Sequence, residues 1–334
     1  MKTPAQIDCA SVLLRDIRAQ LEAGFGAAVV RMMRTPSIYR SSFALEDLDV
    51  EFATGRNHRF ILKHTYRHAL HPDAEQAKPH FLFDPQREPA VYRHVLSHDL
   101  HGTAVCYAVV APKDIGAYVL VLERVCGQEL YQVGEFEIWE EVARWLARFH
   151  RNVAHHDMQR SPELGRHLLR YDATYYRTWL SRAREFQKGD APASEFLNRL
   201  STRYGEVVDR LSSIPSTVIH GELYASNVLV ARGNPIRVCP VDWEMAGYGP
   251  GLLDLSALVS GRWGDNQRRQ LFAAYVNELE ASINDQETLW SQLQYCRLFH
   301  CIQWMGWAPK WNPPADHRQD WLSTAIGLSD VLCL

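Results

Sequence analysis

The sequence predicts an α+β protein in which a strand-rich first part precedes a mostly helical second part. After residue 135, apolar residues recur at helical spacing, most regularly over 135–151. A run of strands followed by a run of helices is typical of α+β folds, whereas strands and helices alternate in α/β folds. Apolar runs bounded by turn signals predict strands over 27–34, 43–52, 59–66, 103–111 and 117–123.

Length and composition limit the classes of protein that fit. The chain has 334 residues, enough for one large two-part unit or two ordinary domains. A net charge of −3 gives no electrostatic reason to expect nucleic acid or an anionic membrane as partner. No apolar run approaches the roughly 18 residues that span a bilayer, and the N-terminus lacks the apolar core of a signal peptide. Seven cysteines without a C-x-x-C pair indicate reduced thiols, so we expect a cytoplasmic protein of undetermined oligomeric state.

The spacing of apolar residues and the positions of Gly and Pro predict the remaining helices. Ile7, Leu14, Ile17 and Leu21 predict a helix over 5–23 that packs on the first part of the chain. The segment 161–211 predicts two or three further helices. After Asp254 the pattern is helical again, with breaks at Gly261, Gly306 and Pro313-Pro314.

The stretch from His220 to Asp242 carries the strongest chemical signal. Two short β-branched runs flank a turn at 231–235 and predict a hairpin. A hairpin brings the groups at its open end together, so Glu222 and Asn227 can lie near Asp242. Two carboxylates and an amide oxygen are hard oxygen ligands that suit Mg²⁺.

This stretch resembles a known family. His220-x-Glu222-x-x-x-x-Asn227, followed by Val241-Asp242-Trp243-Glu244, is similar to the catalytic and metal-binding loops of the aminoglycoside phosphotransferase and choline kinase superfamily, relatives of protein kinases. Pro250 and Asp254-Leu255 extend the resemblance. It implies a protein-kinase-like two-lobed fold, with a β-rich lobe over 1–123, a hinge over 124–134 and a helical lobe with the acceptor pocket over 135–334.

The resemblance also implies roles for these residues. Asn227 and Asp242 would hold Mg²⁺ and the nucleotide phosphates, and Glu222 would accept or orient the proton of the acceptor hydroxyl. His220 and Asp254 would brace the loop. Glu222 stands where the family has Asp, and its extra methylene changes the reach of the carboxylate by about 1.5 Å. The substitution affects the base, not the metal site.

Lys63 lies within the apolar third strand, where the burial of a charged lysine side chain has to be explained. The resemblance implies that Lys63 contacts the nucleotide phosphates and is steadied by Glu88, from the following helix. Pro89 suits a first helical turn and confines Glu88 to the start of that helix. The alternative is a lysine on an edge strand that faces water.

Two further segments would contact the nucleotide. The loop 36–43 has no glycine, but Ser41 and Ser42 could present hydroxyl and backbone N–H groups to phosphate. At the predicted hinge, the resemblance implies that the carbonyl of Glu123 and the N–H of Val125 pair with the nucleotide base.

Other constellations are less specific. His220-x-Glu222 has the spacing of a zinc deaminase motif, but the required P-C-x-x-C is absent. His64, His68 and His71 could line up on one helix as metal ligands, or form an ordinary polar connector. Six tryptophans near the C-terminus could either wall an acceptor pocket or pack helices together: Trp263, Trp290, Trp304, Trp307, Trp311 and Trp321.

The predicted function is transfer of the γ-phosphate of Mg-ATP or Mg-GTP to a hydroxyl of a small molecule such as an antibiotic, a sugar or an amino alcohol. A nucleotide-binding pseudokinase that scaffolds or senses is the alternative, because Glu222 replaces the family's base. A third possibility is a metal-dependent hydrolase that uses the same oxygen ligands to activate water.

Overall fold

The computed structural model divides the chain into two compact units. The strand-rich unit comprises 1–76, 83–127 and 231–244, and the helical unit comprises 77–82, 128–230 and 245–334. The residues that the structure describes are 4–37, 42–96, 102–111, 118–154, 162–307 and 319–334.

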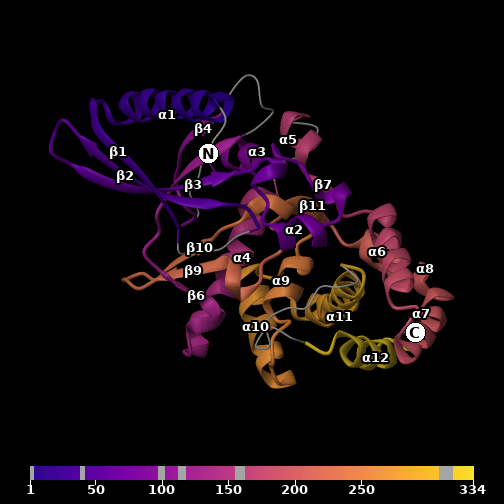
Figure 1. Ribbon diagram of the computed structural model, residues 1–334. Coiled ribbons are helices and arrows are strands. Elements are labelled where there is room, and N and C mark those ends of the chain that lie inside the picture. Colours follow the sequence, from indigo (N-terminus) through magenta and orange to yellow (C-terminus); the bar gives the residue numbers. More distant parts are fainter. Residues whose placement is uncertain (1–3, 38–41, 97–101, 112–117, 155–161, 308–318) are drawn as a thin grey trace. The chain divides into compact units, whose positions relative to one another are not determined.

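The strand-rich unit is built on one five-stranded antiparallel sheet with strand order β1-β2-β3-β5-β4 (Figure 1). Each predicted strand is present, with ends shifted by no more than a few residues. Because β3 is the middle strand, Lys63 lies inside the sheet, and the edge-strand interpretation of this lysine is wrong. The strands are β1 (Val29–Pro36), β2 (Leu45–Phe52), β3 (Asn57–His64), β4 (Cys106–Val110) and β5 (Val119–Glu123).

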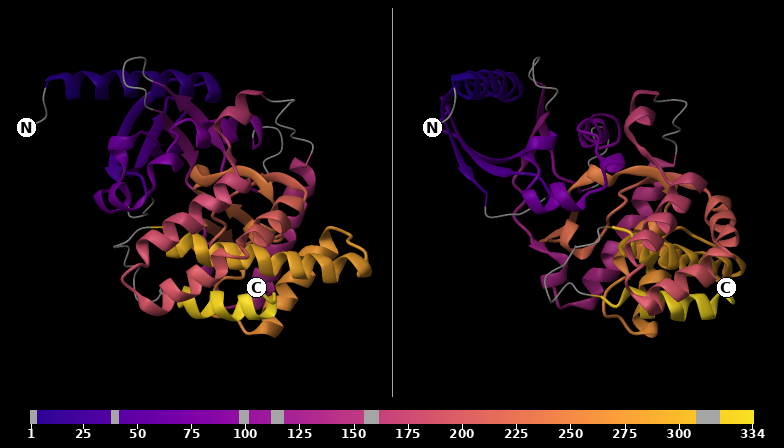
Figure 2. Two further views of the ribbon diagram at one scale, coloured as in Figure 1. Left: turned by 90° about the vertical axis from the view of Figure 1, so that its right-hand side faces the viewer. Right: turned by 45° about the vertical axis from the view of Figure 1, so that its right-hand side comes forward.

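Helix α1 (Pro4–Phe25) lies along one face of this sheet (Figure 2). Leu13, Ile17 and Leu21 pack with Leu48 and Phe60 in one apolar cluster. Their helical spacing and the alternation along the strands bury these side chains together, so the helix and the sheet share one apolar core. The same unit contains α2 (Pro72–Ala77) in part, α3 (Arg87–His94) and β10 (Arg237–Pro240).

The helical unit surrounds a small sheet of β7, β11 and β8, while β6 pairs with β9 (Figure 1). None of the helices in the described part of the chain is long and apolar enough to cross a membrane. The strands are β6 (Gln128–Glu129), β7 (Leu169–Arg170), β8 (Ser216–Ile219), β9 (Val228–Ala231) and β11 (Gly247–Pro250). The helices are α4 (Phe136–Val153), α5 (Pro162–His167), α6 (Ala173–Phe186), α7 (Ala191–Ser201), α8 (Tyr204–Ser213), α9 (Leu252–Leu258), α10 (Asp265–Glu278), α11 (Ile283–Met305) and α12 (Trp321–Val331).

Two predictions need correction. The described residues 162–213 form four helices, α5 to α8, where two or three were predicted, because β7 separates α5 from α6 and short turns at 187–190 and 202–203 separate α6, α7 and α8. His64, His68 and His71 do not share a helix: His64 ends β3 and His68 lies in a separate single turn of 3₁₀ helix. Among the described residues, no group of three His, Cys, Asp or Glu side chains has the arrangement of a metal site.

Candidate active site

Lys63 is the centre of a buried charge cluster in the strand-rich unit. Its side chain is only 4% exposed, and its Nζ lies 2.6 Å from Glu88 Oε2 and 2.6 Å from Asp242 Oδ1. The ion pair with Glu88 that the resemblance implies is therefore present. One cation thus lies between two buried carboxyl groups.

The start of α3 holds the segment after Asp242 in place. Glu88 Oε1 accepts a hydrogen bond from the backbone N–H of Trp243 at 3.2 Å. Arg87, also buried, donates from Nη1 to the carbonyl of Glu244 at 2.7 Å. Glu88 thus contacts both the lysine and the backbone beside the aspartate, so it fixes the two groups relative to each other.

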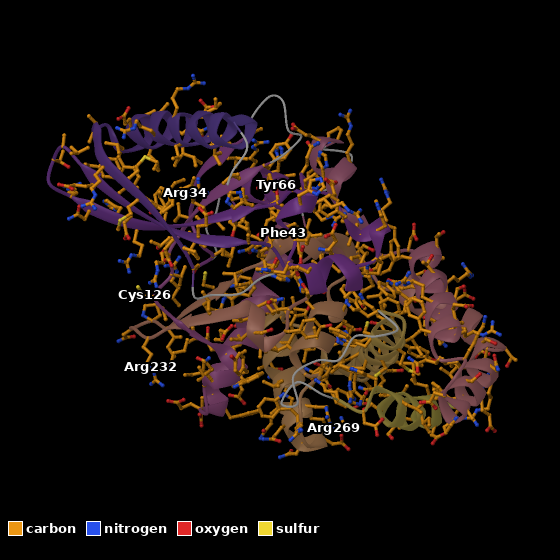
Figure 3. The ribbon with its side chains drawn as sticks, viewed as in Figure 1. Arg34, Phe43, Tyr66, Cys126, Arg232 and Arg269 are labelled. Carbon is orange, nitrogen blue, oxygen red and sulfur yellow. The ribbon has the colours of Figure 1, made fainter. Side chains whose placement is uncertain are left out.

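Burial and charge shift the proton affinities of this cluster. Burial lowers the pKa of Lys63, but the carboxylates of Asp242 and Glu88 outweigh it, so the pKa lies above its ordinary value. Burial raises the pKa of Glu88 to about 7 although Lys63 opposes the shift. The ring of Phe43, labelled in Figure 3, lies 5.8 Å from Lys63 Nζ and keeps one side of the ammonium group apolar. Lys63 therefore remains charged at neutral pH.

Asp242 has an unusual backbone conformation, with φ of +67°. Such left-handed geometry in a residue other than glycine costs on the order of 1 kcal/mol or more and concentrates at functional sites. Aspartate tolerates it better than most residues do. The conformation is kept because Glu88 and Arg87 bind the two residues that follow.

In the helical unit, the loop that starts at His220 is anchored by a fully buried carboxylate. Asp254 in α9 accepts hydrogen bonds from the backbone N–H of His220 at 2.7 Å and of Gly221 at 2.8 Å. His150 Nε2, from α4, lies 3.2 Å from the same carboxylate. His150 was not assigned a role from the sequence. The carboxylate pairs with backbone donors of the loop, which is the bracing that the resemblance implies for Asp254.

Gly221 is required by this anchoring. Its φ is +85°, and a Cβ there would lie 2.2 Å from the carbonyl oxygen of Met245. The backbone N–H of Glu222 donates to His220 Nδ1 at 3.3 Å, so the histidine ring also supports the loop from within. Together these contacts fix where the half-buried Glu222 leaves the backbone.

Asn227 is oriented so that it can serve as an oxygen ligand. Its Nδ2 donates to the carbonyl of Glu222 at 2.9 Å, and no described residue donates to its side-chain oxygen. That oxygen and the carboxylate of Asp242 are the donor types that Mg²⁺ prefers. Asn227 and Asp242 thus each have an oxygen donor of the kind that a bound magnesium ion takes.

Tyr224, two residues after Glu222, joins the loop to α11. Its hydroxyl lies 3.0 Å from His300 Nε2, and Trp304 Nε1 donates to it at 2.7 Å. Because Trp304 Nε1 also approaches His300 Nε2 at 3.2 Å, the network places the ring proton of His300 on Nδ1. Trp321 from α12 stacks on Trp304 with ring centroids 5.7 Å apart. A pocket wall was one of two roles predicted for Trp304 and Trp321, but no contact of theirs with the loop was predicted.

His300 makes the stability of this network sensitive to acid. Burial and the neighbouring Arg297 lower the pKa of His300 to about 3. Below the ordinary pKa of histidine, the unfolded chain binds a proton at this residue that the folded chain cannot bind. The free energy of unfolding therefore decreases as the pH decreases. Between about pH 7 and pH 5 we expect His300 to cost about 2 kcal/mol of unfolding free energy. Urea unfolding at both pH values measures this, and His300→Gln should reduce the loss. An equal loss in the variant would contradict the assignment.

The remaining predicted site residues lie as follows. Ser41 lies outside the described residues, and Ser42 accepts a backbone hydrogen bond from His71 at 3.0 Å. The side chain of Glu123 binds Arg237 through two contacts of 2.6 and 2.7 Å, which the sequence did not predict. That pairing lowers the pKa of Glu123. Val125 is buried. The nucleotide contacts of these four residues stay predictions.

Comparison with known proteins assigns a chain with this sheet, charged cluster and anchored loop to a class of enzymes, the small-molecule phosphotransferases with a protein-kinase-like fold. A model of the phosphotransferase enzyme family (APH) matches residues 45–292. The chain belongs to this family. Among curated proteins, none matches the sequence.

Solved structures agree on the fold. Ethanolamine kinase from Plasmodium vivax aligns with a TM-score of 0.59 at 12% identity, over 91% of this chain and 82% of that one. The GDP complex of aminoglycoside 2'-phosphotransferase-IIIa aligns with a TM-score of 0.56 at 14% identity, over 94% and 96%. A choline/ethanolamine kinase family protein from Mesorhizobium loti aligns with a TM-score of 0.52 at 16% identity, over 95% and 92%. At these identities the likeness concerns the fold.

Proposed function

We propose that this protein transfers the γ-phosphoryl group of Mg-ATP or Mg-GTP to a hydroxyl group of a small molecule. The observation that carries the proposal is the buried Lys63, held between Glu88 and Asp242 on the middle strand of the sheet. A permanently charged lysine that is steadied by a glutamate suits the phosphates of a nucleotide. The similar fold of a GDP complex supports a nucleotide as the phosphoryl donor.

In the proposed reaction the acceptor oxygen attacks the γ-phosphorus, and the bond between that phosphorus and the β,γ-bridging oxygen breaks. The nucleoside diphosphate leaves with the electron pair. Glu222 takes the hydroxyl proton and passes it to solvent. The contacts that Asp254 and His220 make with the loop backbone preorganise the position of Glu222, which is what phosphoryl transfer needs most from the protein.

Asn227 and Asp242 are the residues that we propose to hold Mg²⁺. The bound ion supplies neutralisation of charge on the transferring phosphoryl group. Lys63 adds a second cation, Ser42 and Ser41 bind phosphate, and the backbone of Glu123 and Val125 binds the base. Within this proposal the segment 124–134 serves as the hinge of a lobe pair over 1–123 and 135–334.

The test is release of ADP or GDP from the purified protein with a panel of alcohols, sugars and antibiotics. We expect release that depends on both magnesium and one acceptor class, together with thermal stabilisation by the Mg-nucleotide. Stabilisation without release under any acceptor would favour the pseudokinase, which the replacement of the family's Asp by Glu222 makes the second candidate. Phosphate release that does not depend on acceptor would instead indicate a hydrolase.

A further inference from the structure

A cavity of about 410 Å³ in the helical unit is not used by the chemistry described so far. Its wall comes from α9, α10, α11, α12 and the segment after α9. Figure 1 labels these helices, and α11 packs against α12. The volume lies in the range of small-molecule sites. Three arginines contribute to the wall: Arg262, Arg268 and Arg297.

Arg297 is a half-buried cation without a carboxylate partner in the described part of the chain. Its Nη1 donates to Gln294 Oε1 at 2.7 Å. Burial and the charge of Arg268 lower its pKa to about 10, so the guanidinium stays charged at neutral pH. Removing a charge from water without a counter-ion is costly, and an anion in the cavity would offset that cost.

The acidic groups near the cavity do not neutralise it. Asp265 lies 3.2 Å from Arg268, but its side chain is 92% exposed, so solvent weakens the pair. The carboxylate of Asp320 is occupied at the start of α12, where it accepts from the backbone N–H of Ser323 at 2.9 Å and from its hydroxyl at 2.7 Å. His300 is neutral because of its low pKa. The wall therefore keeps an excess of positive charge.

The hydroxyl groups of the wall complement the arginines. Ser256 donates to the carbonyl of Leu253 at 2.7 Å, and Ser260 donates to that of Ala257 at 2.7 Å. Because each hydroxyl donates its proton to a backbone carbonyl, its oxygen remains available to a ligand only as a hydrogen-bond acceptor. The cavity thus offers donors for an oxyanion and acceptors for a hydroxyl or ammonium group.

The cavity also adjoins the loop that carries the candidate base. His300 lines it and lies 3.0 Å from the hydroxyl of Tyr224, two residues after Glu222. Trp321 lines it as well, and its ring centroid is 5.6 Å from that of His300. A molecule in the cavity is therefore held by the same helix that supports the loop.

We propose that this cavity binds an oxyanion, a carboxylate or a phosphate, of the hydroxyl acceptor, with Arg297 and Arg268 as the binding residues. The acceptor is then an anionic alcohol, such as a hydroxy acid, a hydroxy amino acid or a sugar phosphate, and not a polycationic antibiotic. The acceptor role rests on the kinase activity proposed above. The proposal that the cavity binds an anion does not depend on that activity.

Binding is measured first, by calorimetry on the full chain without nucleotide. The probes are glycerate, serine and glycerol 3-phosphate, with glycerol and serinol as their neutral counterparts. We expect at least one anionic probe to bind at least about tenfold more tightly than its neutral counterpart, since hydrogen bonds to charged groups are worth this much. Preference for glycerate or serine identifies a carboxylate site, and preference for glycerol 3-phosphate identifies a phosphate site.

Variants then test the residues. Arg297→Gln and Arg268→Gln should each weaken binding of the preferred anion about 10- to 100-fold, with Mg-ATP binding unchanged. Arg269→Gln is the matched control: Arg269, labelled in Figure 3, follows Arg268 on α10 but lies over the Trp290 ring at 4.4 Å and does not line the cavity. Arg297→Lys, which keeps the charge, should restore part of the affinity. Thermal unfolding of each variant checks that it is folded.

The outcomes separate this inference from the proposed kinase. If no anionic probe binds, or if Arg297→Gln binds the anion as the parent does, the anion site is wrong. If neutral alcohols alone drive ADP release, the kinase stands and the anionic acceptor is wrong. If anions bind through Arg297 and no acceptor of the whole panel, anionic or neutral, drives ADP release, the anion site stands and the kinase is wrong.

Discussion

Lys63→Met should lower the rate of acceptor-dependent ADP release about 100- to 1,000-fold, because loss of a preorganised charge at a transition state has effects of this size. Asp242→Asn should give a similar loss, since it removes one negative charge while an amide tolerates the left-handed backbone at this position. Steady-state kinetics with the best acceptor measures both. Activity close to that of the parent in Lys63→Met would exclude Lys63 from the phosphate site.

Loss of activity has to be separated from loss of folding. Removing Lys63 takes the counter-ion from the buried Glu88, and losing one partner of a buried ion pair destabilises proteins by up to about 3 to 5 kcal/mol, or less when the carboxyl group takes up a proton. The double variant Lys63→Met with Glu88→Gln removes both charges of the pair and should recover most of that stability. We expect it to remain as inactive as Lys63→Met. Urea unfolding of the two variants distinguishes the contributions, and Lys188→Met, at an exposed position of the helical unit, serves as the control.

Glu222→Gln should lower turnover about 100-fold or more while Mg-ATP still stabilises the protein, because a general base contributes 10²- to 10⁴-fold. The amide keeps the size of the side chain and leaves the backbone contacts of Glu222 in place, but it cannot take the proton. Single-turnover ADP release measures the chemical step directly. Glu206→Gln, on the exposed side of α8, is the matched control. Turnover equal to the parent would mean that Glu222 is not the base.

Glu222→Asp tests the length of the side chain. It shortens the reach by about 1.5 Å, and errors of about 1 Å can cost on the order of a hundredfold in rate. If the loop is adapted to glutamate, this variant should therefore be slower than the parent. A large gain in turnover would instead favour drift from an active aspartate enzyme toward a pseudokinase.

Much of the fold was predictable because its signals are local. The strand pattern placed Lys63 in the third strand, and Pro89 placed Glu88 in the first turn of a helix, which is α3 in the structure, although α2 lies between this helix and the strand. The resemblance to the family also identified Glu222 and the later Asp254 as site residues. The sequence did not predict the contacts that join these residues, such as the hydrogen bonds that the loop backbone donates to the carboxylate of Asp254.

The residues that form the wall of the cavity could not be predicted from the sequence, and the reason is physical. Arg268 and Arg297 belong to different helices, and a charged residue on a helix has the same local pattern whether it faces solvent or a cavity. Tyr224 and His300 likewise meet only through the fold. Tryptophans near the C-terminus were ambiguous for the same reason: Trp307 stacks on Trp179 as packing, whereas Trp321 lines the cavity.

Helix α9 allows acceptor choice and catalytic competence to be engineered separately. Asp254 and Ser256 are two positions apart, so they project from nearly opposite sides of the helix, one toward the loop backbone and the other into the cavity wall. Ser260 and Thr324 line the cavity as well. A library that randomises Ser256, Ser260 and Thr324 and keeps Asp254 fixed would therefore change the proposed acceptor specificity and leave the support of the loop intact.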